Sequence, residues 1–173
     1  MKLQLFPFLV INPRICTHII YSFLGVDSNG GLNYLDRSEG QVAGYLSRLV
    51  SLKSQNSNLK IIAAIGGYNE MLVPFWSSMA ANSASRSNFA RNCLQFIQKY
   101  NLNGIDIDWE YPNFSGGAAA DKNNFNLLLQ VLKQTLGASY SVSTAIGAGD
   151  WRTGLSYDIP QIFAACDFVN VMT

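Results

Sequence analysis

The sequence predicts an α/β fold, in which a parallel sheet is covered by helices. Short apolar segments typical of strands alternate along the chain with longer segments whose apolar residues recur at helical spacing. The strand segments are continuously apolar, apart from one acidic segment, as expected for strands buried on both faces. The sequence has no repeat, low-complexity tract or linker, so we expect a single domain over residues 1–173.

The predicted strands are short and most of them end in glycine or in a turn-rich loop. The first is followed by Asp27 and a Ser-Asn-Gly-Gly segment, and the second ends abruptly in Gly66 and Gly67. The strands cover residues 16–24, 59–65, an acidic segment within residues 103–112, residues 140–146 and residues 167–172.

The predicted helices show apolar residues at the spacing of one helix face. The second helix should begin near Ser83 or Ser85, the third should stop at Gly137, and the last carries Pro160 in its first turn. The helices cover residues 41–55, 89–100, 125–136 and 159–165.

This pattern alone does not separate an open, doubly wound sheet from a (β/α) barrel. Neither GxGxxG nor GxxxxGK[ST] is present, which weakens a nucleotide-binding interpretation. In both architectures the functional residues lie at the C-terminal ends of the strands. The sequence places a group of candidates there, namely Glu110, Tyr111, Gly66, Gly67, Tyr68, Asn69, Ala145 and Met172.

Charge and composition exclude several classes of partner. Twelve Lys and Arg against eleven Asp and Glu give a formal charge of +1, without a basic stripe or an acidic tail. We therefore expect no nucleic acid and no membrane surface as partner, and a neutral substrate fits this balance better. No apolar run reaches the ~18 residues of a membrane span, and Pro7 interrupts the only segment that resembles a signal peptide.

The cysteines give no metal site. Cys16, Cys93 and Cys166 lie far apart and form no CxxC motif or Cys/His cluster. Three buried thiols are the simplest interpretation, and one disulfide with one free thiol stays open. His18 is more typical of a core histidine than of a catalytic base.

Three acids concentrate at alternating positions in the acidic strand. Asp106, Asp108 and Glu110 alternate with Ile105, Ile107 and Trp109, so a strand would put all three carboxylates on one face. Asp and Glu are poor strand formers, and like charges on one face cost stability. A sequence accepts such a cost mainly at a functional site.

Three kinds of chemistry compete for these carboxylates. Hard oxygen ligands would suit Mg²⁺ or Ca²⁺, but no EF-hand loop or second acidic cluster accompanies them. A solvated acidic patch fits poorly with the apolar residues between them. Crowded carboxylates must raise at least one pKa, which favours acid/base catalysis with Glu110 as a protonated general acid. The neighbouring Trp109 and Tyr111 would form an aromatic shelf for a sugar ring.

The segment Asn-Gly-Ile-Asp-Ile-Asp-Trp-Glu-Tyr-Pro at residues 103–112 closely resembles the catalytic signature of glycoside hydrolase family eighteen, the chitinases. Further segments agree in order: residues 16–23 resemble the second barrel strand, residues 64–69 the third-strand motif, and residues 170–173 the start of the sixth-strand motif. The resemblance covers about residues 14–173 and implies a (β/α)8 TIM barrel.

The resemblance implies retaining, substrate-assisted cleavage of β-1,4-linked N-acetylglucosamine polymers, chitin or chito-oligosaccharides, an exception to the two-carboxylate scheme. Glu110 would protonate the glycosidic oxygen, Asp108 would orient the N-acetyl group that attacks the anomeric carbon, and Asp106 would share a proton with Asp108. No metal and no organic cofactor is implied. The implied sugar-contacting residues are Gly66, Gly67, Tyr68, Asn69, Tyr111, Ala145, Met172 and Thr173, with Tyr21 and Phe23 as the floor of the site.

The sequence also departs from the family pattern. Asn103 replaces the Asp common at the start of the signature, and Tyr68 stands where a Trp is usual. The family's first strand is not recognisable in residues 1–13, which leaves Cys16 without its usual partner. A complete barrel takes ~250 residues, so we expect about five to six of the eight strands and impaired turnover by these residues alone.

Two alternatives to an active enzyme stay open. One is a chitinase-like lectin that binds chitin or oligosaccharides without turnover, although such lectins typically lose the acid that Glu110 supplies. The other is a truncated product without independent function. By family resemblance we expect an extracellular protein, although the sequence shows no convincing signal peptide.

Overall fold

A curved sheet forms the centre of the computed structural model, which describes residues 11–173 except residues 36 and 115. The strands are β1 (His18–Val26), β2 (Leu32–Asn33), β3 (Lys60–Gly66), β4 (Gly104–Asp108), β5 (Ser141–Gly147) and β6 (Phe168–Met172). Their spatial order is β2-β1-β3-β4-β5-β6. All neighbours run parallel except β2, which is antiparallel to β1. The predicted α/β class with a parallel sheet is confirmed.

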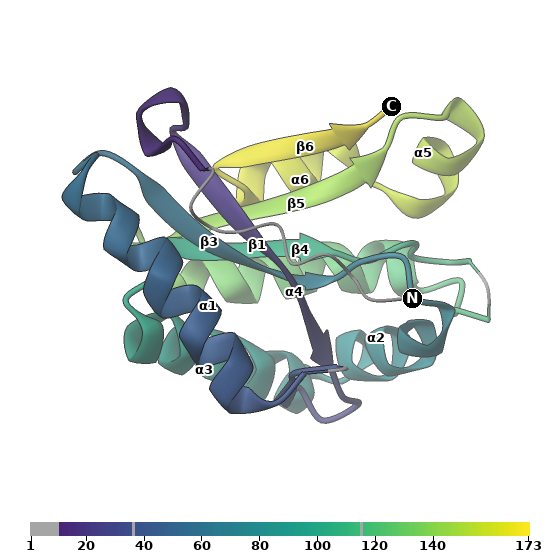
Figure 1. Cartoon of the computed structure of the whole chain (residues 1–173). Coiled ribbons are helices and arrows are strands. Elements are labelled where there is room, and N and C mark those ends of the chain that lie inside the picture. Colours follow the sequence, from purple (N-terminus) through teal and green to yellow (C-terminus); the bar gives the residue numbers. More distant parts are fainter. Residues whose placement is uncertain (1–10, 36, 115) are drawn as a thin grey trace, which may run out of the picture.

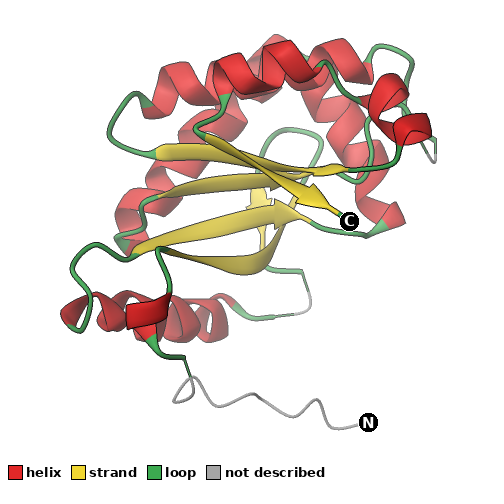
Figure 2. Ribbon diagram, turned by 90° about the horizontal axis from the view of Figure 1, so that it is seen from above, coloured by secondary structure: helices red, strands yellow, loops and turns green. Residues whose placement is uncertain are grey.

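Helices follow the sheet on its outer side, as Figure 2 shows. The α-helices of the described part are α1 (Glu39–Ser51), α2 (Val73–Ala81), α3 (Ser83–Tyr100), α4 (Asp121–Leu136), α5 (Asp150–Ser156) and α6 (Ile159–Ala165). Short 3-10 helices cover Pro13–Ile15, Leu52–Ser54 and Glu70–Leu72. None of the described helices has both the length and the apolar character that crossing a membrane requires.

The strands and helices expected from the pattern are present within a few residues of their predicted bounds, and α6 matches its prediction. The elements that the pattern missed are β2, α2 and α5. β2 has only two residues. α2 carries Pro74 in its first turn and has few polar residues, so its sequence shows little contrast between two faces. α5 has seven residues and contains Gly154, which makes it a weak helix by sequence.

Helix boundaries follow from polar residues at their ends. Asn82 caps α3 by accepting hydrogen bonds from the N–H groups of Ala84 and Ser85, which explains the predicted start at Ser83. The same helix ends at Tyr100, and the next residue, Asn101, caps it in the left-handed conformation with φ 53°. Ser38 and Gln41 form a reciprocal capping box at the start of α1.

The alternation along the acidic strand is confirmed on its apolar side. Ile105, Ile107 and Trp109 are fully buried in the core between the sheet and the helices. The Trp109 ring stacks on Trp76 of α2 at a centroid distance of 5.7 Å and an interplanar angle of 12°. Phe125 of α4 packs against Trp109 in a T-shaped arrangement, also at a centroid distance of 5.7 Å. Trp109 therefore anchors the end of the acidic segment to two helices.

The histidine and the cysteines take structural positions. His18 is the first residue of β1, so it lies at the N-terminal end of this strand. Its ring centroid lies 5.3 Å from that of Phe168. Burial and the nearby Lys60 lower the pKa of His18. Cys93 is buried, Cys16 and Cys166 are half-buried, and all three are free thiols.

The sheet of the described residues is open at β6. This strand pairs with β5 on one side, and Val171 within it is 55% exposed. On the neighbouring helix α6, Phe163 is 61% exposed. An unpaired strand edge presents backbone N–H and C=O groups that another strand can bind.

Gly66, at the end of β3, is expected to tolerate no side chain. Its φ is +116°, and a Cβ placed there would lie 2.1 Å from the backbone oxygen of Asp108. We expect Gly66→Ala to lower the free energy of unfolding by about 3 kcal/mol or more, as measured by urea denaturation.

Gly44 in α1 provides the matched control. A Cβ there would meet nothing within 4 Å, so Gly44→Ala should raise the free energy of unfolding by up to about 1 kcal/mol. Similar small effects of the two substitutions would show that the β3–β4 contact at Gly66 is not tight.

Candidate active site

The acidic side of β4 lies on the inner face of the sheet, opposite the core. Asp106 and Asp108 are 3% and 6% exposed, whereas Glu110 follows the end of the strand and is half-buried. The prediction that all three acids belong to one strand is therefore correct for two of them. Glu110 lies in the loop after β4. The hydrogen bonds between the strands therefore do not fix its position directly.

Two polar side chains hold Asp106. Ser143 of β5 donates its hydroxyl hydrogen to Oδ1 of Asp106 at 2.5 Å, and the amide of Asn170 in β6 donates to the same oxygen at 3.2 Å. Burial raises the pKa of Asp106, and these two hydrogen bonds act in the opposite direction. These two hydrogen bonds fix Oδ1 of Asp106, and neither of them involves Oδ2.

Asp108 carries the raised pKa that crowded carboxylates require. Burial raises its pKa to about 7, with further contributions from the charges of Glu110 and Asp106 and from a hydrogen bond with Glu110. Its Oδ1 is buried without a hydrogen-bond partner among the described residues. Near neutral pH, Asp108 is therefore present in both its protonated and its ionised form, and the protonated form can donate a hydrogen bond.

The glycines after β3 bring the backbone close to these carboxylates. Gly66 is the register partner of Asp108, and the N–H of Gly67 donates to the backbone oxygen of Asp108 at 2.9 Å. A Cβ at Gly67 would lie 2.8 Å from the ring of Phe23, so this ring packs directly against the glycine. Phe23 and the glycine pair are therefore brought together at the C-terminal ends of β1, β3 and β4.

The other predicted sugar-contacting residues surround the same ends of the strands. Tyr68 is 73% exposed, and Asn69 accepts a hydrogen bond from the N–H of Met71. The ring of Tyr111 lies 6.5 Å from that of Phe114. Ala145 of β5 is buried, Met172 at the end of β6 is half-buried, and Thr173, which follows β6, is exposed.

Two predicted aromatic contacts are placed elsewhere. Tyr21 is buried in the core, and its hydroxyl accepts a hydrogen bond from Arg37 at 3.4 Å. The structure does not bring Tyr21 to the carboxylates. The prediction of a sugar-binding shelf at Trp109 is wrong, because this ring is fully buried between Trp76 and Phe125.

Sequence reasoning missed three polar residues near the carboxylates. Ser143 and Asn170 could have been found as polar residues inside otherwise apolar strands. Tyr157, just after α5, gave no such signal. Burial raises the pKa of its hydroxyl, which the negative charges of Asp108 and Glu110 raise further.

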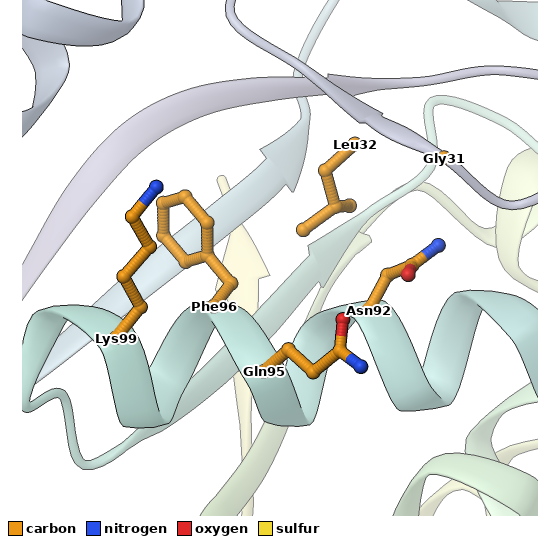
Figure 3. Close-up of a pocket in the computed structure, with 6 residues that line it drawn as sticks. All are labelled: Gly31, Leu32, Asn92, Gln95, Phe96 and Lys99. Atoms are coloured by element: carbon orange, nitrogen blue, oxygen red, sulfur yellow. The ribbon is translucent and has the colours of Figure 1, made fainter.

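The described residues contain no group of three or more His, Cys, Asp or Glu side chains that could hold a metal ion. A hollow of about 350 Å³ lies between β2 and α3, lined by Gly31, Leu32, Asn92, Gln95, Phe96 and Lys99 (Figure 3). It contains none of the predicted site residues. The acidic end of β4 therefore stays the candidate site.

Comparison with known proteins agrees with this location. The family model "Glycosyl hydrolases family 18" matches residues 3–173. The "Probable chitinase 2" of Drosophila melanogaster is 34% identical over 168 residues, which cover 93% of this chain and 34% of the relative. The chain thus spans about a third of the length of this relative.

Solved structures show the same fold. A Group IV chitinase of Ostrinia furnacalis, solved in complex with allosamidin, superposes with a TM-score of 0.86 at 33% identity. A variant of catalytic domain 2 of the Group II chitinase of the same organism, in complex with penta-N-acetylchitooctaose, gives 0.86 at 26% identity. Each match covers 94% of this chain and 44% of the other.

The described sheet thus corresponds to part of a (β/α)8 barrel, as predicted, and the carboxylates of its acidic strand lie on the inner face of the sheet. The family match extends over nearly the whole chain, and the relative from Drosophila melanogaster exceeds 30% identity over nearly all of it. The chain belongs to family 18 of the glycosyl hydrolases.

Proposed function

We propose that this protein cleaves β-1,4-linked N-acetylglucosamine polymers by a retaining, substrate-assisted mechanism. Glu110 protonates the glycosidic oxygen, and the N-acetyl oxygen of the substrate attacks the anomeric carbon to give an oxazolinium intermediate. Asp108 orients the N-acetyl group and stabilises this intermediate, and Asp106 takes part in the proton exchange. Water then opens the intermediate with retention of configuration.

The observation that carries this proposal is the contact between Asp108 and Glu110. Burial of Asp108 and the charges of the neighbouring Glu110 and Asp106 raise the pKa of Asp108 to about 7. A proton can therefore move within the carboxylate row near neutral pH, as a general acid and its partner require. Ser143 and Asn170 hold the far end of the row by binding Asp106.

The substrate class rests on the relatives. The Ostrinia furnacalis structures were solved with allosamidin and with penta-N-acetylchitooctaose, a chito-oligosaccharide. Chitin or its oligosaccharides are therefore the proposed substrates, and by resemblance to its family the protein is proposed to act outside the cell.

Single-turnover cleavage tests the proposal, because protein in excess over a chito-oligosaccharide reveals even slow reactions. We expect the first product to carry the β-anomer at its new reducing end, observed by proton NMR before mutarotation. An α-anomer that accumulates faster than mutarotation can form it would contradict the retaining mechanism. Tight binding without cleavage would instead favour a lectin, and the absence of both would contradict the proposed function.

A further inference from the structure

Glu110 lies in the loop that follows β4, and the strand itself ends at Asp108. On its N-terminal side, the buried ring of Trp109 between Trp76 and Phe125 anchors this loop. On its C-terminal side, the backbone of residues 111–113 forms no regular structure. The orientation of Glu110 therefore depends on what holds this second side.

Ser156 holds one point of this segment from α5. Its hydroxyl donates a hydrogen bond to the backbone oxygen of Pro112 at 2.7 Å, and the residue is 1% exposed. The bond joins residues 44 positions apart in the chain. A hydroxyl buried in this way forms a bond without competition from water, so it restrains the carbonyl effectively.

Asp121 holds the next point from the start of α4. It is a fully buried carboxylate, and its Oδ2 accepts from the N–H of Ala118 at 2.8 Å and from the N–H of Asn113 at 3.4 Å. Its Oδ1 accepts from the hydroxyl of Ser77 in α2 at 2.7 Å. A buried charge needs such partners, and its place in the first turn of α4 is favourable to a negative charge.

We propose that Ser156 and Asp121 are positioning residues, which fix residues 112 and 113 and thereby hold Glu110 in place for proton transfer. Helices α2 and α5, which carry Ser77 and Ser156, lie at the same end of the sheet (Figure 1), and Asp121 is the first residue of α4. The two residues act through hydrogen bonds to the backbone of residues 112 and 113. This inference rests on the proposed function for its catalytic part only.

Amide hydrogen exchange tests the positioning without any need for activity. Ser156→Ala and Asp121→Asn should each speed exchange at Asn113 about tenfold or more, while exchange in β3 and β5 stays unchanged. Ser87→Ala is the matched control, because it removes an exposed hydroxyl that donates to the Ser83 carbonyl at 2.9 Å in α3. Unchanged exchange at Asn113 in both variants would overturn the inference.

Single-turnover kinetics test the consequence for Glu110. Ser156→Ala should lower the maximal cleavage rate about 10- to 100-fold, with the half-saturating protein concentration and the pH dependence unchanged, and Ser156→Thr should restore the rate. Faster exchange at Asn113 with an unchanged cleavage rate would overturn the role in positioning Glu110. If the wild-type protein does not cleave, the proposed function fails, and the exchange measurement still decides whether these residues fix the loop.

Discussion

Replacing Glu110 by Gln is expected to slow cleavage of chito-oligosaccharides about 10²–10⁴-fold, the usual contribution of a general acid. The amide has nearly the same size as the carboxyl group but supplies no acidic proton to the leaving oxygen. Because Glu110 lies in a loop and is half-buried, the substitution should leave the fold intact. Single-turnover rates with a fluorogenic chito-oligosaccharide, together with the midpoint of urea unfolding, check both expectations.

Glu39→Gln is the matched control for this substitution. Glu39 begins α1 and forms an exposed ion pair with Lys99 at 2.5 Å, away from the carboxylate row. The cleavage rate of this variant should equal that of the wild type, since exposed ion pairs contribute little. An equal rate for Glu110→Gln would contradict the role of the acid, whereas a loss in both variants would indicate a general effect on folding.

Replacing Asp108 by Asn is expected to stabilise the protein at alkaline pH while removing its activity. Burial and the charges of Glu110 and Asp106 raise the pKa of Asp108 from 3.8 to about 7. Such a carboxyl group has a higher pKa in the folded protein than in the unfolded chain. It stabilises the fold most at pH values below its pKa in the unfolded chain, and this stabilisation is lost as the pH rises towards 7. The asparagine variant does not ionise, so it should escape this loss.

We expect the variant to exceed the wild type by roughly 2–4 kcal/mol in free energy of unfolding at pH 8, and to equal it near pH 3. Urea denaturation at both pH values, with unchanged slopes, measures this difference. Equal stabilities at pH 8 would show that Asp108 is not buried as a charge. A gain in stability together with a loss of activity is expected when a charge that serves function is removed from a buried site.

Asp167→Asn provides a control of opposite sign. Burial acts to raise the pKa of Asp167, but its hydrogen bonds with Lys133 and with the N–H of Val142 outweigh burial and lower it. A carboxylate with a lowered pKa in the folded protein stabilises the fold at pH values above its pKa in the unfolded chain. This contribution is lost as the pH falls. The variant should therefore be less stable than the wild type at pH 8 and should differ less at low pH.

Local patterns account for what the sequence could predict. Ile105 and Ile107 alternate with Asp106 and Asp108, and this period of two determines which residues enter the core and which enter the site. The ends of the strands follow from glycines such as Gly66, where the chain must turn. These features depend on neighbours in sequence, and the periodicity therefore reveals them.

Other features depend on contacts between distant segments. Trp109 continues the alternation of the strand, but its burial between α2 and α4 was hidden because α2 itself was not predicted. The bonds of Ser156 to Pro112 and of Asp121 to Ser77 join residues 44 positions apart. A polar residue in a helix gives no local sign of such a partner, so the support of the acid became visible only in three dimensions.

The stacked pair of Trp76 and Trp109 makes the site accessible to spectroscopy. Both indole rings are almost fully removed from water, and one of them belongs to the residue before Glu110. Emission from such rings is expected at short wavelength, and it shifts to the red when water reaches them. Any ligand or substitution that loosens the packing beneath the acid should thus change the fluorescence of this pair. Because the sequence also contains Trp151, replacing both Trp76 and Trp151 by Phe would leave the signal of Trp109 alone.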